Sequence, residues 1–100
     1  MIKNGDFVLI RTYSAGVHFG TLVERNGKEV HLKDARRLWQ WSGALSLSEV
    51  AMNGINISAS KVSVPVDEIL LTEAIEIIPI SIDSKLPGND KVRKDVSVKV

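Results

Sequence analysis

The fold class of this chain follows from one stretch, Gly20-Thr21-Leu22-Val23-Glu24-Arg25-Asn26-Gly27-Lys28-Glu29-Val30-His31-Leu32-Lys33. Two runs with β-forming residues flank Asn26-Gly27, which is the strongest short-range signal for a β-hairpin. A two-residue turn there would place Glu24 opposite Glu29 and Arg25 opposite Lys28, and like charges directly across two strands are unfavourable. The sequence therefore predicts the hairpin and leaves its register open, with a longer loop or a bulge as the alternative.

Further strands are predicted on both sides of the hairpin. Residues 7–13 are rich in β-branched and aromatic side chains, and Ser14-Ala15-Gly16 breaks that strand. The alternation in residues 37–41 predicts a short strand with Arg37, Trp39 and Trp41 on one face. Residues 62–66 are expected to be extended, and Pro65 places them at an edge or in an irregular strand.

Residues 68–80 fit both a helical and a strand period. Their β-branched content near Pro79 favours a strand over 74–81, and residues 67–72 are interpreted as a turn plus a strand. Residues 91–100 show an alternating Val pattern, which predicts either a terminal strand, on this chain or on a partner subunit, or a frayed tail.

One short helix is predicted between the strands. Ser46 can cap it, Glu49 completes a Ser-x-x-Glu capping box, and Leu45 can pack on Val50 as a hydrophobic staple. Asn53-Gly54 ends the helix after about two turns. Residues 55–57 are expected to form a brief strand.

These elements predict a mainly β protein, with antiparallel sheets and one short helix in a small single domain. Residues 1–84 are expected to form a β-rich ligand-sequestering domain, and residues 85–100 a C-terminal tail or terminal strand. A chain of 100 residues has little room for a deep pocket of its own. Assembly as an oligomer, with a site between subunits, is therefore expected.

The charge distribution favours a small anionic ligand over a nucleic acid polymer. The net charge is only +1, but residues 1–61 carry +3 (eight Lys and Arg, five Asp and Glu), residues 62–84 carry −5, and residues 85–100 carry +3. A nucleic-acid binder usually has a stronger basic excess over a whole face. Cysteine is absent, and no signal segment or membrane-spanning run is recognisable, so an intracellular protein without disulfides is expected.

The pair Arg36-Arg37, followed by Trp39 and Trp41, is the first candidate binding constellation. Guanidinium groups can hold phosphate oxygens in a bidentate manner while indole planes stack on a base. The alternative is that the tryptophans belong to the core, which is favoured for Trp41, and that the arginines form a solvated edge.

The loop from Tyr13 to Gly20 is the second candidate. Backbone N–H groups around Gly16 can form an anion-binding concavity, and Tyr13, His18 or Phe19 can stack on a base. The alternative is an ordinary hairpin loop with Phe19 in the core. The loop matches neither of the standard Gly-rich phosphate-binding patterns.

Signals for catalysis are weak. His18 and His31 match no metal-ligand spacing, and the acidic residues of 67–76 lack the spacing of a calcium loop. No serine lies in a nucleophile motif with an identifiable base. The sequence thus favours binding without catalysis, metal or cofactor.

Several segments resemble one phage protein family. They are Arg11 to Leu22 (RTYSAGVHFGTL), Arg25 to Val30 (RNGKEV), Asp34 to Ala44 (DARRLWQWSGA), Ser60-Lys61, and Glu73 to Pro79 (EAIEIIP). Over residues 9–81 the chain is similar to the first-described phage Thoeris anti-defence protein, a small β-rich sponge for cyclic ADP-ribose signals.

This resemblance implies a function in the cytoplasm of an infected bacterium. A TIR-domain enzyme of Thoeris defence makes glycocyclic ADP-ribose, and the phage protein binds this messenger without cleaving it. Members form homo-oligomers, dimers or hexamers in some, with ligand sites between subunits, and some also bind cyclic oligonucleotides in a separate pocket. No membrane or nucleic acid polymer is implied as a partner. A small β-barrel module that binds single-stranded nucleic acid is the alternative from the residues alone.

The family motifs, carried over to this chain, give these expected ligand-binding residues: Tyr13, Ser14, Gly16, His18, Phe19, Arg36, Arg37 and Trp39. Arg11 is a further candidate for a phosphate contact, and so is Arg93 on the C-terminal tail, which lies outside the segments that resemble the family.

Overall fold

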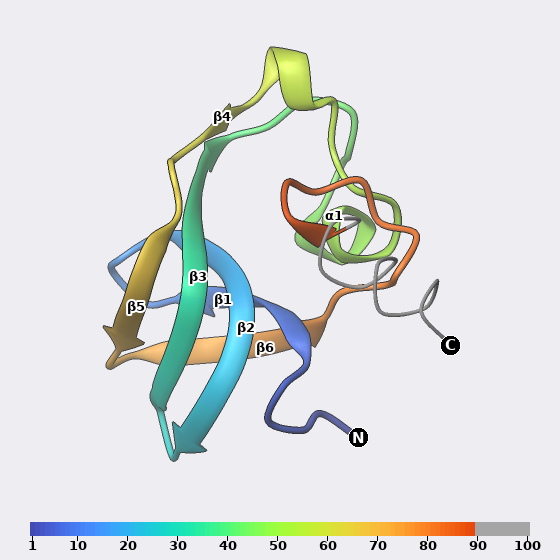
Figure 1. The fold of residues 1–100 in the computed structure, drawn as a ribbon. Coiled ribbons are helices and arrows are strands. Elements are labelled where there is room, and N and C mark those ends of the chain that lie inside the picture. Colours follow the sequence, from blue (N-terminus) through green and yellow to red (C-terminus); the bar gives the residue numbers. More distant parts are fainter. Residues whose placement is uncertain (90–100) are drawn as a thin grey trace.

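The computed structural model describes residues 1–89 and confirms a mainly β chain with one short helix. An antiparallel sheet contains β1 (Phe7–Thr12), β2 (Val17–Asn26), β3 (Glu29–Gln40), β4 (Lys61–Val62), β5 (Val66–Leu71) and β6 (Ala74–Pro79). The strand order is β4-β3-β2-β1-β6, and β5 pairs with the other end of β3. The sheet curls so that β5 and β6 come close to forming a barrel (Figure 1). Within residues 1–89, no helix is long and apolar enough to cross a membrane.

Strand β1 is buried on both faces, because two hydrophobic cores lie on its opposite sides. Leu9 contributes to the first core, where the sheet packs against α1 (Leu47–Asn53). Val8 and Ile10 contribute to the second core, inside the curl of the sheet. This explains why β1 is a continuous apolar run rather than an alternating one.

The hairpin between β2 and β3 is confirmed, and its register is shifted from the two-residue turn at Asn26-Gly27. Asn26 pairs with Glu29, so that Gly27 and Lys28 form the turn. Gly27 has φ +62°, a value that favours glycine. Glu24 consequently pairs with His31 instead of Glu29, and this removes the unfavourable pairing of like charges.

The two predicted strands at 28–33 and 37–41 are one long strand, β3, with a bulge between its halves. The register shifts between Phe19 and Thr21, and Asp34 on the facing strand has φ +51°. A Cβ at Gly20 would lie 2.9 Å from the Lys33 carbonyl oxygen and 3.0 Å from the Ala35 Cα. The bulge therefore brings the backbones close together at a glycine.

The helix α1 has the predicted start and end. The Ser46 hydroxyl accepts a hydrogen bond from the Glu49 backbone N–H, and the Glu49 carboxylate accepts one from the Leu45 backbone N–H. The predicted staple is wrong, because Leu45 is 97% exposed. The predicted strand at 55–57 is also wrong, since a 3-10 helix (Ile57–Ala59) begins there.

Strand β6 confirms the strand predicted over 74–81, and β5 occupies most of the segment interpreted as a turn plus a strand. The packed part of the chain continues beyond the boundary predicted at residue 84. Leu86 is in the first core, and the buried Asn89 amide donates to the carbonyls of Ser81 and Ser84 at 3.0 and 2.7 Å. The terminal strand predicted within residues 91–100 lies outside the described residues.

Candidate functional site

Residues from the two candidate constellations line one open groove of about 440 Å³, here called the Trp39 groove. One wall is the loop between β1 and β2, and the other is the end of β3. The loop contributes Ser14, Ala15, Gly16 and Val17, and β3 with the residue after it contributes Arg37, Leu38, Trp39 and Trp41. The structure thus unites four of the predicted site residues: Ser14, Gly16, Arg37 and Trp39.

The loop wall is fixed by its own hydrogen bonds. The Thr12 hydroxyl donates to the Gly16 carbonyl and accepts from the Ala15 backbone N–H, both at 2.8 Å. Gly16 has φ +84°, a conformation that side chains other than glycine's rarely adopt. The Ser14 hydroxyl donates to the Glu73 carboxylate at 3.0 Å and ties the loop to the start of β6.

His18 lies beneath this loop and is 2% exposed. Its Nε2 is 2.9 Å from the Ala15 carbonyl oxygen, so the neutral ring must carry its proton on Nε2 and donate it there. Burial lowers the pKa of His18 below its ordinary value of 6.5, and the nearby Arg37 charge adds to this lowering, although the bond to Ala15 opposes it. His18 therefore supports the groove from below as a neutral ring.

Arg37 and Trp39 supply the exposed chemistry of the groove. The Arg37 backbone N–H donates to the Ser63 hydroxyl at 2.8 Å, which holds this part of β3 in place. Within residues 1–89, the Arg37 guanidinium has no hydrogen bond or carboxylate partner, because the ion pairs there are Arg11–Glu76 and His31–Glu68. The Trp39 side chain is among the exposed large hydrophobic groups, at 64%.

Trp41, for which the sequence favoured a core position over a binding one, has a mixed role. Its indole is half-buried, packs against the first core, and still lines the groove.

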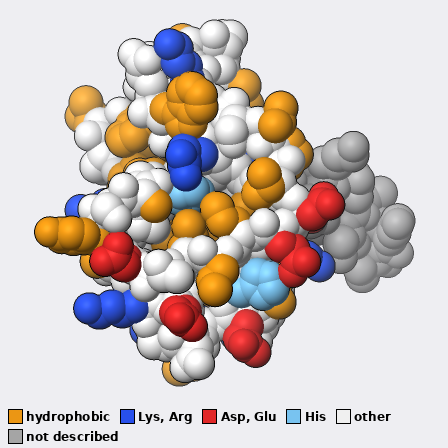
Figure 2. Space-filling view, turned by 90° about the vertical axis from the view of Figure 1, so that its left-hand side faces the viewer, with side chains coloured by type: hydrophobic (Ala, Val, Ile, Leu, Met, Phe, Trp, Pro, Cys, Tyr) orange, Lys and Arg blue, Asp and Glu red, His pale blue; other side chains and the backbone are white. Residues whose placement is uncertain are grey.

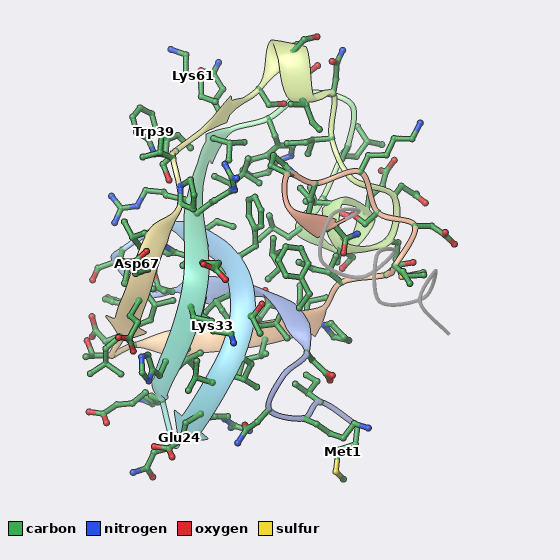
Figure 3. All side chains as sticks on the ribbon, viewed as in Figure 1. Met1, Glu24, Lys33, Trp39, Lys61 and Asp67 are labelled. Atoms are coloured by element: carbon green, nitrogen blue, oxygen red, sulfur yellow. The ribbon has the colours of Figure 1, made fainter. Side chains whose placement is uncertain are left out.

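Lys61 was not predicted for the site. It pairs with Gln40, the residue after Trp39, and both Trp39 and Lys61 point outward at the upper end of the molecule (Figure 3). The position of Lys61 near Trp39 depends on the pairing of β4 with β3. The sequence alone does not show this pairing.

On the face that includes β5, basic and acidic side chains gather in different regions. Figure 2 shows basic and hydrophobic side chains together in the upper part of this face, and acidic side chains mostly below them. The upper end of this face, where β3 meets β4, carries the exposed side chains Arg37, Trp39 and Lys61. An anion approaching this end therefore meets the more positive part of this face.

Other predicted residues are placed elsewhere. Phe19 is fully buried and packs edge-on against Phe7, with ring centroids 6.0 Å apart, so it supports the fold and cannot stack on a ligand. Arg36 points away from the groove, because successive side chains of a strand alternate. It lines a different cavity with Asp34, and its guanidinium donates to the Ser63 carbonyl at 3.4 Å.

Arg11 and Tyr13 are also outside the groove. The Arg11 guanidinium is 2.7 Å from the Glu76 carboxylate. Tyr13 is 77% exposed and lines a small cavity with Lys28 and Glu73. Arg93 lies outside the described residues. Among residues 1–89, no group of three or more His, Asp or Glu side chains is arranged to hold a metal ion.

Comparison with known proteins gives the family of the chain. Residues 5–86 match the family described as "Domain of unknown function (DUF6948)", and because this covers most of the chain, the protein belongs to that family. No curated protein and no solved structure shows significant similarity to the chain.

Proposed function

We propose that this DUF6948 protein is a non-catalytic binding protein that sequesters a small phosphate-bearing nucleotide in the Trp39 groove. The observation that carries the proposal is that the Arg37 guanidinium, which has no partner within residues 1–89, and the exposed Trp39 indole line the same groove as the Gly16 loop. Together with the resemblance to the Thoeris anti-defence family, this supports glycocyclic ADP-ribose as the proposed ligand. The protein would then block Thoeris signalling in the cytoplasm of the infected host.

The side chains and the loop that line the groove offer different interactions. The Arg37 guanidinium can hold phosphate oxygens in a bidentate manner, and the Trp39 indole offers a plane for adenine. The Gly16 loop presents backbone to the same space. Sequestration requires only that these groups bind the nucleotide. It needs no nucleophile and no general base.

The strength of these interactions supports an oligomer. Hydrogen bonds to charged groups contribute about 1.5–3 kcal/mol each, and base stacking about 1–3 kcal/mol per base. The single arginine and the exposed indole of one groove fall short of the roughly −12 kcal/mol of nanomolar binding. The proposal therefore includes a homo-oligomer, a dimer or a hexamer, in which a second copy closes the groove.

The first experiment tests sequestration. The protein is mixed with an equimolar amount of glycocyclic ADP-ribose, the complex is separated from free ligand, and heat denaturation then releases the bound molecule. We expect intact messenger, identified by mass spectrometry. Release of ADP-ribose or AMP, or turnover when the messenger is in excess over protein, would show that the protein is an enzyme.

Native mass spectrometry of the protein from cells that make the messenger tests the assembly. We expect a homo-oligomer with the messenger bound. A monomer that binds the messenger with nanomolar affinity would remove the second copy from the proposal, while leaving the groove as the site.

Binding of single-stranded nucleic acid is the second candidate. It is favoured by the position of Lys61 on the strand beside Trp39, at the upper end of a curled β-sheet. Such binding would weaken steeply with salt. An oligonucleotide that binds at low salt and competes with glycocyclic ADP-ribose would support it, and no binding at low salt would dismiss it.

A further inference from the structure

A second cavity lies at the opposite end of the molecule from the Trp39 groove. It has a volume of about 560 Å³ against about 440 Å³ for the groove, and the two share no lining residue. It is enclosed by the N-terminal segment, the hairpin between β2 and β3, and β6. Figure 3 shows this lower end, where Met1 and Glu24 are labelled. We call it the lower cavity.

Aliphatic side chains form much of the lining of the lower cavity. Ile2, Leu22, Ile75 and Ile77 line it. Leu22 belongs to the second core, and Ile2 and Ile77 pack against that core, so this part of the surface is rigidly supported. Among the residues that the structure describes, no aromatic side chain lines the cavity, so these residues offer no plane on which a nucleobase could stack.

Two cationic side chains, Lys3 and Arg25, line the same cavity. The Arg25 Nε donates to the Gly27 carbonyl at 3.1 Å, which orients the guanidinium and leaves its terminal N–H groups without a hydrogen-bond partner among residues 1–89. The Lys3 backbone N–H donates to the Asp6 carboxylate at 2.9 Å, and this fixes the N-terminal segment. Neither cation has a carboxylate within ion-pair distance in the described chain.

Glu76 also lines the cavity, but its carboxylate is already engaged. The Arg11 guanidinium lies 2.7 Å from the Glu76 carboxylate, and Arg11 itself does not line the cavity. The unbalanced charge at the lower cavity is therefore positive, beside an aliphatic surface. We infer that the lower cavity is a second binding site, which takes a small amphipathic anion with one carboxylate-like group and a short aliphatic body.

This inference is independent of the proposed function and is tested with sodium octanoate and the full-length protein. In a titration followed by ¹H–¹⁵N NMR, we expect saturable shifts of the amides of Lys3, Arg25 and Ile75, without shifts at Arg37 and Trp39. In a series from acetate to octanoate, the affinity should rise by up to about fourfold for each methylene that becomes buried. Octan-1-ol, which has the aliphatic body without the charge, should bind more weakly than octanoate.

Charge-removing variants separate a built site from general surface attraction. We expect Arg25→Gln and Lys3→Gln each to weaken octanoate binding about threefold or more, as for other partly exposed charge pairs. The control, Lys33→Gln, removes an exposed cation of β3 that does not line the cavity, and should leave binding unchanged. No saturable shifts with millimolar octanoate, equal affinity for acetate and octanoate, or equal effects of the three variants would overturn the inference.

Discussion

Arg36 and Arg37 are neighbours in the chain but have different surroundings. Arg37 is exposed in the Trp39 groove, whereas Arg36 is half-buried in a cavity on the other face of β3. The sequence prediction treated them as a pair that grips one ligand. The alternation of side chains along a strand allows only one of them to reach a given groove in one copy.

We expect Arg37→Ala to weaken binding of glycocyclic ADP-ribose tenfold or more, because it removes charge-assisted hydrogen bonds worth about 1.5–3 kcal/mol each. The melting temperature should change little, since the Arg37 side chain has no partner in the described structure. Isothermal titration calorimetry and thermal unfolding measure the two effects. With Lys33→Ala as the control, equal affinities of the two variants would exclude Arg37 from the site.

His18 should make the stability of the fold dependent on pH. Because its pKa in the folded protein is lowered from 6.5, the unfolded chain binds more protons than the folded one between the two values. The stabilising contribution of the neutral ring is therefore complete above pH 6.5 and is lost as the pH falls through the folded pKa. Urea unfolding at about pH 7.5 and about pH 5.5 should show a lower free energy of unfolding in acid.

Two variants assign this effect. We expect His18→Phe to reduce the difference between the two pH values, because the buried titrating group is gone. His31→Gln removes the other histidine, on the exposed face beside Glu68, and should leave the His18 contribution in place. If the free energy of unfolding depends on pH equally in His18→Phe and in the parent protein, the burial of the neutral His18 ring is not the cause of that dependence.

At the scale of elements, the bulge between β2 and β3 depends on Gly20. A methyl group there would come within 3.0 Å of backbone atoms of β3, and the backbone cannot move aside as a flexible side chain can. We expect Gly20→Ala to lower the free energy of unfolding by about 1–3 kcal/mol, the usual cost of overpacking. The exposed Glu24→Ala on the same strand should stay within about 0.5 kcal/mol of the parent. Equal stabilities of both variants, measured by urea unfolding, would contradict the close approach.

Elements with strong local signals were predictable, and those that depend on distant contacts were not. The Asn26-Gly27 dipeptide and the Ser46 cap are local patterns, so the hairpin and the helix were predicted correctly. The register was left open, and the structure settles it with Glu24 opposite His31. The staple by Leu45 failed, because whether a side chain finds a core depends on tertiary packing.

The same division applies to the candidate site. The period of two predicted that Arg37 and Trp39 share a face, and both line the groove. The sequence left open whether Phe19 stacks on a ligand or lies in the core, and the structure confirms the core, where Phe19 packs against Phe7. The sequence could not show that β4 brings Lys61 next to Gln40. These facts depend on strand order and on the packing of the first core, neither of which leaves a local pattern.

At the scale of the whole molecule, the segment after β6 is part of the packed structure. Leu86 is 3% exposed in the first core, whereas Leu45 is 97% exposed. We expect Leu86→Ala to cost about 2–5 kcal/mol of unfolding free energy and Leu45→Ala almost nothing. This pair applies the same substitution at a buried and an exposed position. A small effect of Leu86→Ala in urea unfolding would show that residues 85–89 are dispensable for the fold.

The burial of β1 on both faces has a consequence for how the molecule comes apart. Leu9 in the first core and Val8 in the second are adjacent in the chain. Both cores therefore share β1, and neither can unfold while the other remains packed on this strand. Unfolding should therefore be a single cooperative transition, with equal calorimetric and van't Hoff enthalpies. The amide protons of β1 should then exchange with solvent only through that global event.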